Sequence, residues 1–144
     1  MTTDKLYSHI LMPLENSAAD ATILAHVRRV AKFCGSKITV LHVADGFMAR
    51  NQARLAESPE MEKDRLYLEK VCAELGAEGF DANAVLVCGE PADQILAYAN
   101  QSGCDLIAMA THGHTGLSDV ILGSVAAKVR HRTCIPVLLV KAKS

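Results

Sequence analysis

The stretch that decides the fold of this 144-residue chain is DLIAMATHGHTGLSDVILGS, residues 105–124, which is followed by PVLLV at residues 136–140. An apolar run leads into glycine and small hydroxyl residues, and a helical pattern containing Gly123 and Ser124 comes next. A loop of this kind that runs into a helix N-terminus presents backbone N–H groups and the positive end of the helix dipole to an anion. The stretch therefore predicts a phosphate-binding loop, although Gly113 and Gly116 also fit an ordinary turn between a strand and a helix.

Apolar runs and helical patterns alternate along the rest of the chain. The runs predict buried strands at 9–14, 37–43, 84–88, 105–110 and 136–140, and the patterns predict helices at about 18–33, 60–75, 91–102 and 117–131. Ser17 is expected to cap the first helix, and residues 45–59 fit either a short helix or a long connection. Because the strands are continuous apolar runs, the chain is predicted to be one doubly wound α/β domain over residues 1–144, with a parallel sheet covered on both faces.

Composition narrows the expected partners and location. Half of the residues are hydrophobic, 22% are charged and the net charge is −1, so nothing indicates binding to nucleic acid or to a membrane surface. The five cysteines form no C-x-x-C pair, which favours a reducing compartment. The first apolar run is short and is broken by Pro13, unlike a signal peptide or a membrane span, so a cytoplasmic location is expected.

Four motifs in order carry a family resemblance. They are ILMPLENS at 10–17, LHV at 41–43, GEP at 89–91 and ATHGHTGLSDVILGS at 110–124, and CIPVLLVK follows at 134–141. With these motifs the chain resembles the universal stress protein family over essentially its whole length. The resemblance implies five parallel strands in the order 3-2-1-4-5 and a homodimer built around the last strand. It also implies that many, but not all, members bind ATP.

The resemblance also implies where a nucleotide would bind. In open α/β sheets a ligand binds where the strand order reverses, which here is between the exits of the first and fourth strands. Nucleotide-binding members look like G-x2-G-x9-G-(S/T), and this chain has Ala110, Gly113, Gly123 and Ser124 at those positions. Ser124 would supply a hydroxyl and an N–H at the start of a helical turn. The implied cofactor-binding residues are Pro13, Leu14, Glu15, Val43, Met109, Ala110, His112, Gly113, His114, Gly123, Ser124 and Val125.

Within that set, Val43 and Met109 match positions that pack on adenine, and Glu15 matches an acidic position that contacts ribose or metal. The chain departs from the pattern at four positions: Glu15 replaces aspartate, Asn16 and Ala110 replace glycine, and His114 replaces lysine or arginine. Ala110 is compatible with binding if its φ is negative, whereas a neutral His114 offers phosphate less charge.

No catalytic residue is predicted. No nucleophile with its own base accompanies Glu15, and His112 and His114 have no third ligand that would make a zinc site. His42 is expected to be a packed or hydrogen-bonded histidine.

The expected function is therefore that of an ATP-binding regulatory or signalling module in the stress response, with Mg²⁺ or Mn²⁺ accompanying the nucleotide. Two alternatives stay open. One is a family member that binds no nucleotide and acts through protein–protein contacts, and the other is a slow ATPase or an autophosphorylating protein.

Overall fold

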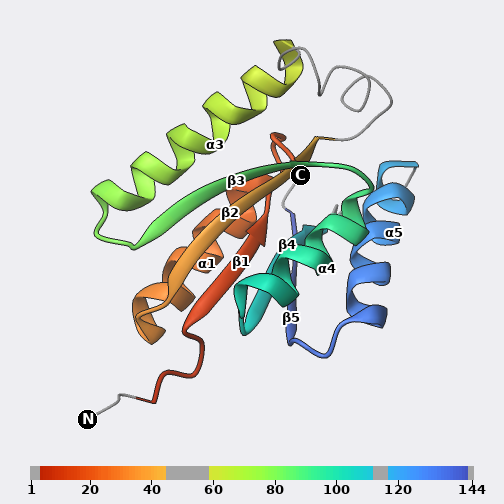
Figure 1. The fold of residues 1–144 in the computed structure, drawn as a ribbon. Helices are drawn as coiled ribbons and strands as arrows, with labels where there is room; N and C mark the ends of the chain where they lie inside the picture. The colour runs from red at the N-terminus through yellow and green to blue at the C-terminus, as the bar shows by residue number, and fades with distance from the viewer. Residues whose placement is uncertain (1–3, 45–58, 112–116, 143–144) are drawn as a thin grey trace.

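The computed structural model describes residues 4–44, 59–111 and 117–142, with the backbone alone for 117–122. These residues form a parallel five-stranded sheet with helices on both faces (Figure 1). The strand order is β3-β2-β1-β4-β5, as the family resemblance implied. The elements along the chain are β1 (His9–Pro13), α1 (Asp20–Cys34), β2 (Lys37–Ala44), α3 (Pro59–Ala77), β3 (Ala82–Cys88), α4 (Pro91–Ser102), β4 (Leu106–Thr111), α5 (Leu117–Arg132) and β5 (Val137–Lys141).

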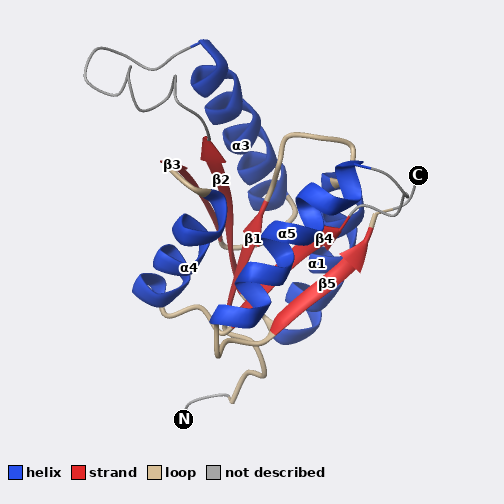
Figure 2. Cartoon of the chain, turned by 90° about the vertical axis from the view of Figure 1, so that its right-hand side faces the viewer, coloured by secondary structure: helices blue, strands red, loops and turns tan. Residues whose placement is uncertain are grey.

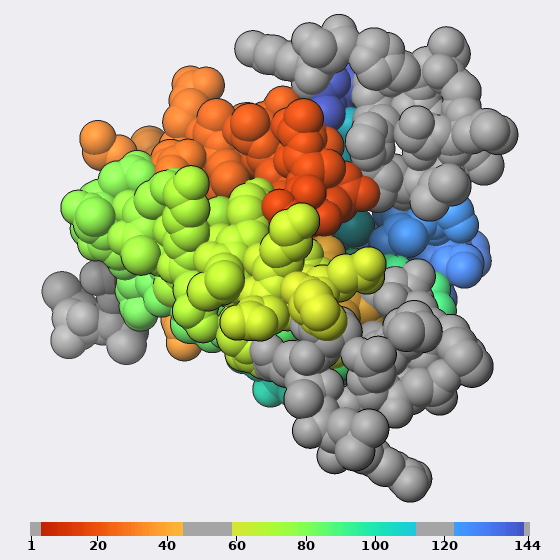
Figure 3. All heavy atoms as spheres, turned by 90° about the horizontal axis from the view of Figure 1, so that it is seen from above, coloured from red at the N-terminus to blue at the C-terminus, as the bar shows by residue number. Residues whose placement is uncertain are grey.

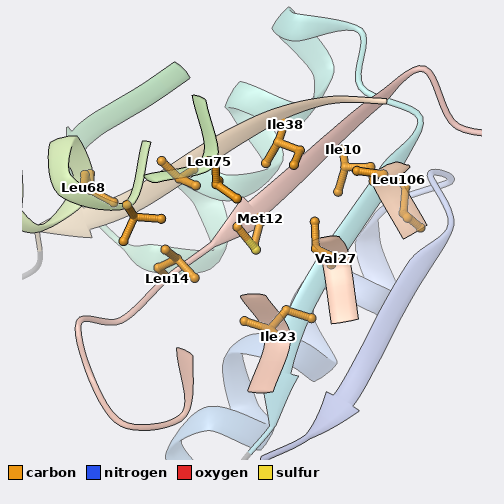
Figure 4. Close-up of a cluster of buried hydrophobic side chains, with 13 residues drawn as sticks. Ile10, Met12, Leu14, Ile23, Val27, Ile38, Leu68, Leu75 and Leu106 are labelled. Carbon is orange, nitrogen blue, oxygen red and sulfur yellow. The ribbon is translucent and has the colours of Figure 1, made fainter. Parts of the chain in front are cut away.

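The hydrophobic core lies in two layers, one on each face of the sheet (Figure 2). Successive side chains of a strand point to opposite faces, so Ile10 and Met12 of β1 pack with α1 and α3, while Leu11 packs with α4. Figure 4 shows the first layer, where Ile23 and Val27 of α1 join Leu68 and Leu75 of α3 and strand residues such as Ile38 and Leu106. Each of these buried side chains contributes about 1.5–3 kcal/mol relative to an exposed one. Burial on both faces is the reason that the strands consist mainly of continuous apolar runs.

The ends of α1 are fixed in two different ways. Its C-terminus is closed by Gly35, which has a φ of 72° and donates its N–H to the carbonyl of Ala31 at 2.7 Å. Its N-terminus differs from the prediction, because the cap position is held by Ala19 and not by Ser17. The carboxylate of Asp20 instead reaches back and accepts the N–H groups of the preceding loop, so the expected cap was wrong.

The sheet opens between β1 and β4. These strands pair only at Ile10↔Leu106 and Leu11↔Ile107, whereas β1 stays paired with β2 as far as Pro13↔Leu41. Leu14 donates its N–H to Leu41 O at 2.7 Å, on the β2 side. Neighbouring backbone N–H groups of a strand point to opposite sides, so the backbone nitrogen of Pro13 faces β4. Proline has no N–H to donate there. The first and fourth strands therefore separate at their carboxyl ends, which is the switch point of the fold.

None of the helices within the described ranges is long and apolar enough to cross a membrane.

Candidate functional site

A pocket of about 270 Å³ lies where β1 and β4 separate. Six of the elements contribute to it, together with the loop after β1. Its lining residues are Pro13, Leu14, Glu15, Asp20, Leu41, His42, Val43, Pro91, Ile95, Met109, Ala110 and Val125.

One side of the pocket is apolar. Val43 and Met109 come from the carboxyl ends of β2 and β4, and Ile95 and Val125 come from α4 and α5. Ligand pockets for small molecules usually measure about 300–1,000 Å³. The pocket formed by the described residues is close to the lower end of that range, which suits a flat ring and a sugar more than a whole nucleotide.

The other side carries the carboxylate of Asp20, whose side chain is almost fully buried. The residue is 2% exposed, and its two oxygens accept the N–H groups of Glu15, Asn16 and Ser17 at 3.0, 2.8 and 3.4 Å. The Tyr67 hydroxyl of α3 donates to the same carboxylate at 2.6 Å. Burial, and then this bond to Asp20, raises the pKa of Tyr67, so the phenol stays a donor. Because four donors occupy Asp20, it serves as the internal anion of the loop.

Asn16 explains one departure from the family pattern. It has a φ of 64°, a left-handed backbone that favours glycine and that asparagine tolerates better than most residues. Among the described residues it is the only non-glycine with a positive φ. Ala110, at the end of β4, therefore has a negative φ, which is the condition under which an alanine at this position is compatible with binding.

His42 and Asp64 lie in contact beside the pocket. The His42 Nδ1 atom lies 2.7 Å from the carbonyl oxygen of Leu14, and Nε2 lies 3.1 Å from the carboxylate of Asp64 on α3. The other oxygen of Asp64 accepts from the Asn16 side-chain amide at 3.2 Å. The histidine is hydrogen-bonded, as the sequence predicted, but its place at the pocket was not foreseen.

The structure brings most of the predicted site residues together. Those that line the pocket are Pro13, Leu14, Glu15, Val43, Met109, Ala110 and Val125. His112, Gly113 and His114 lie outside the described residues. Gly123 and Ser124 are exposed inside α5, more than a turn after its first residue. Ser124 was expected to supply an N–H at the start of a helical turn, but inside the helix its N–H is not free.

The pocket also includes residues that the sequence did not single out for it, namely Asp20, Leu41, His42, Pro91 and Ile95. Leu41, His42 and Pro91 belong to the LHV and GEP motifs, and these motifs were a signal that could have placed them. Asp20 gave no comparable signal, because an acidic residue in the first turn of a helix is common.

A larger hollow of about 600 Å³ lies at the opposite edge of the sheet, near the amino ends of β2 and β3. Its basic residues include Lys5, whose ammonium donates to Gly35 O at 2.9 Å, and Arg28, which pairs with Glu78 at 2.9 Å. The C-terminus of α1 lies at this end of the sheet, and cations are favoured near the negative end of a helix dipole. The basic residues of the larger hollow are therefore explained without a ligand. The smaller pocket at the switch point is the better candidate for a ligand site.

Metal ligands are few at the pocket. Within 4–44, 59–111 and 117–142, no three histidine, cysteine or acidic side chains gather as a metal site would need. Asp20 is occupied by its four donors, and Glu15, the other carboxylate of the pocket lining, accepts the Ser17 hydroxyl at 3.0 Å and has further acceptor sites that a cation could meet. Mg²⁺ bound with a nucleotide commonly takes one or two protein carboxylates and completes its shell with phosphates and water, so this donor set fits such an ion.

Comparison with known proteins identifies the family. The model of the universal stress protein family matches residues 6–141, and the chain belongs to this family. Universal stress protein MJ0577 of Methanocaldococcus jannaschii is 29% identical over 158 residues, covering 96% of this chain and 98% of that protein.

Solved structures agree with this assignment. The structure of MJ0577 superposes with a TM-score of 0.81 at 30% identity and covers 96% of this chain and 99% of its own. A universal stress protein in complex with cAMP and one from Archaeoglobus fulgidus in complex with dAMP both give TM-scores of 0.71, at 20% and 19% identity. They cover 95% and 94% of this chain and 98% and 99% of their own. At that level of identity the two complexes support the fold alone.

Proposed function

We propose that this chain binds an adenine nucleotide, with ATP and Mg²⁺ or Mn²⁺ as the physiological form, and acts as a regulatory module in the stress response. The observation that carries the proposal is the pocket at the switch point, which has an apolar side at Val43 and Met109 and a carboxylate at Glu15. The apolar side suits adenine, and Glu15 suits a ribose hydroxyl or the metal. Two proteins of the same fold bind cAMP and dAMP, which makes an adenine ring the first choice of ligand.

Gly123 supports this proposal from α5. A Cβ added there would meet no atom of the described residues within 4 Å, so packing between helix and sheet gives no reason for a glycine. A glycine inside a helix costs about 1 kcal/mol relative to alanine. Close approach of a phosphate to the helix backbone would account for that cost, with residues 110–113 supplying the other side of the phosphate site.

The proposal includes a homodimer formed through β5, which lies at the edge of the sheet. The five cysteines are all free thiols, consistent with the reducing cytoplasm that we propose as its location.

Isothermal titration with ATP and Mg²⁺ tests the proposal, using protein verified to be free of co-purified nucleotide. We expect a dissociation constant in the micromolar range, about −8 kcal/mol. Titrations with cAMP and AMP would show how much of the affinity comes from the base and sugar. No heat with any of the three nucleotides at hundreds of micromolar would refute the proposal.

Gly123→Val is expected to abolish nucleotide binding while leaving the thermal unfolding temperature nearly unchanged. The valine side chain would fill the space proposed for phosphate, and it meets no described neighbour that it would displace. Gly76→Val is the matched control, because Gly76 is also helical with open space around it but lies on α3 away from the pocket lining. Retained binding in Gly123→Val, or loss of binding in both variants, would contradict the role of Gly123.

A further inference from the structure

The imidazole ring of His42 has an acceptor oxygen at each nitrogen. The Leu14 carbonyl lies 2.7 Å from Nδ1, and the Asp64 carboxylate lies 3.1 Å from Nε2. A carbonyl oxygen and an ionised carboxylate can only accept, so each ring nitrogen must carry a proton if both contacts are hydrogen bonds. The ring meets both partners only as an imidazolium.

The contact between His42 and Asp64 is largely shielded from water. The side chains of the two residues are only 14% and 20% exposed. The other Asp64 oxygen accepts from the side-chain amide of Asn16 at 3.2 Å. Both oxygens of Asp64 therefore hold groups that belong to, or contact, the loop after β1.

These bonds tie α3 to the loop that forms one wall of the pocket. His42 joins Asp64 to the backbone of Leu14, Asn16 contacts Asp64 directly, and Tyr67 of α3 donates to Asp20 at 2.6 Å. Figure 3 shows the N-terminal half of α3, in yellow, in contact with the region from the end of β1 to the start of α1, in red-orange. The wall residues Leu14 and Glu15 are therefore held in place from α3 as well as from α1.

We infer that His42 and Asp64 are positioning residues of this pocket: the His42 imidazolium clamps the Leu14 carbonyl to Asp64 of α3 and so fixes the wall that carries Glu15. The identity of the ligand rests on the proposed function, but the clamp itself does not. Replacing a residue that orients a metal ligand through a hydrogen bond commonly costs about 10- to 100-fold in affinity, and we expect a loss of similar kind for residues that hold this wall. Nucleotide affinity is therefore coupled to the seating of α3.

The clamp is tested first without any ligand, by nitrogen-15 NMR of the histidine side chains at neutral pH. We expect two ring N–H protons on His42 in the wild-type protein. Asp64→Asn is expected to reduce these to one and to move the backbone amide signals of residues 15–17. Glu69→Gln, at an exposed position on the same helix, is the matched control and should change neither. A singly protonated His42 in the wild-type protein, or unmoved amide signals in Asp64→Asn, would overturn the inference.

The coupling to the pocket is tested by titration with ATP and Mg²⁺. His42→Gln and Asp64→Asn are each expected to weaken binding on the order of tenfold. The double variant should be little weaker than either single one, because the two side chains share one contact. Wild-type affinity in both single variants overturns the inference and leaves the proposed function standing. If the wild-type protein binds no adenine nucleotide, the proposed function fails, and the NMR measurement still decides whether the clamp exists.

Discussion

Asp20 illustrates how much of the pocket depends on a single buried side chain. Its carboxylate accepts three consecutive backbone N–H groups and the Tyr67 hydroxyl while the residue is 2% exposed. A loop with successive N–H groups turned inward is an anion-binding concavity, and here the anion is part of the chain. The phosphate of a nucleotide is therefore not expected to bind at this loop, which leaves the glycine-rich stretch and α5 for that role.

Replacing Asp20 with asparagine is expected to lower the free energy of unfolding by about 2–4 kcal/mol. An amide has one acceptor oxygen for four donors, and its NH₂ group would face N–H groups. Urea denaturation monitored by circular dichroism measures the change. Asp81→Asn, at an exposed position before β3, is the control and should stay within about 0.5 kcal/mol of wild type. Equal stability of the two variants would mean that the carboxylate does not organise the loop.

His9 gives the fold a dependence on pH. Thr39 donates its hydroxyl to Asn83 at 2.7 Å, so its oxygen accepts from His9 Nε2, also at 2.7 Å. Burial, followed by the nearby charge of Lys37, lowers the pKa of His9 below its ordinary value of 6.5. The unfolded chain then binds the proton more readily than the folded one. The stability that His9 contributes is present above pH 6.5 and is lost as the pH falls through the folded value.

We expect the urea concentration at the unfolding midpoint to decrease as the pH is lowered from about 7.5 to about 5.5. The decrease should be smaller in His9→Gln, whose amide keeps a donor for Thr39 but does not titrate. His131→Gln, at an exposed position of α5, should leave the dependence as it is in wild type. The same fall in His9→Gln as in the wild-type protein would show that His9 is not its source.

At the scale of elements, α4 is placed by a short turn after β3. Gly89 in this turn has a φ of 139° and donates its N–H to Ala44 O at 3.2 Å. Glu90 then caps α4 by accepting the Asp93 N–H at 2.7 Å, and Pro91 occupies the start of the helix, as the sequence predicted. Because Pro91 and Ile95 both line the pocket, the turn also determines the shape of the site.

Gly89→Ala is expected to destabilise the protein by about 1–3 kcal/mol. An alanine is strained at this φ, and its Cβ would lie 2.9 Å from the Gln94 Nε2 atom. Thermal unfolding measures the loss. Gly76→Ala is the control with the opposite sign: it lies inside α3 with open space around it and should gain about 1 kcal/mol. An unchanged melting temperature in Gly89→Ala would show that the turn adopts another conformation without cost.

The elements could be predicted from the sequence because their signals are local. Continuous apolar runs identified the strands to within a residue or two. The helix expected at about 60–75 extends to Ala77, with Gly79 beyond it at a φ of 96°. The cap of α1 was predicted wrongly because Ser17 is a good local candidate, whereas Asp20 is stabilised in part by Tyr67 from a distant helix. Contacts of that kind depend on the packing of α3, which no local pattern contains.

At the scale of the whole molecule, the resemblance to a family supplied what local patterns could not. Strand order is set by which strands pair across the chain, and five apolar runs alone are compatible with several orders. The position of the pocket follows from that order, since Pro13, Val43 and Met109 converge only if β1 lies between β2 and β4. The pairing of His42 with Asp64 shows the remaining limit, because it depends on the rotation of α3 about its own axis.

The edge of the sheet leads to a prediction about assembly. Among the described strands β5 pairs with β4 alone, so its outer backbone groups face away from the sheet, and Leu139 on this strand is 37% exposed. Figure 2 shows β5 at the edge, with α1 and α5 on either side of it. An apolar edge strand of this kind pairs readily with another chain unless a charge blocks it.

We expect a homodimer in sedimentation equilibrium, and Leu139→Lys should shift it to monomer with little change in thermal stability. Leu66→Lys is the control, because Leu66 is 59% exposed on α3, away from this edge, and should leave the dimer intact. A monomeric wild-type protein, or a dimer that persists in Leu139→Lys, would show that β5 is not the interface.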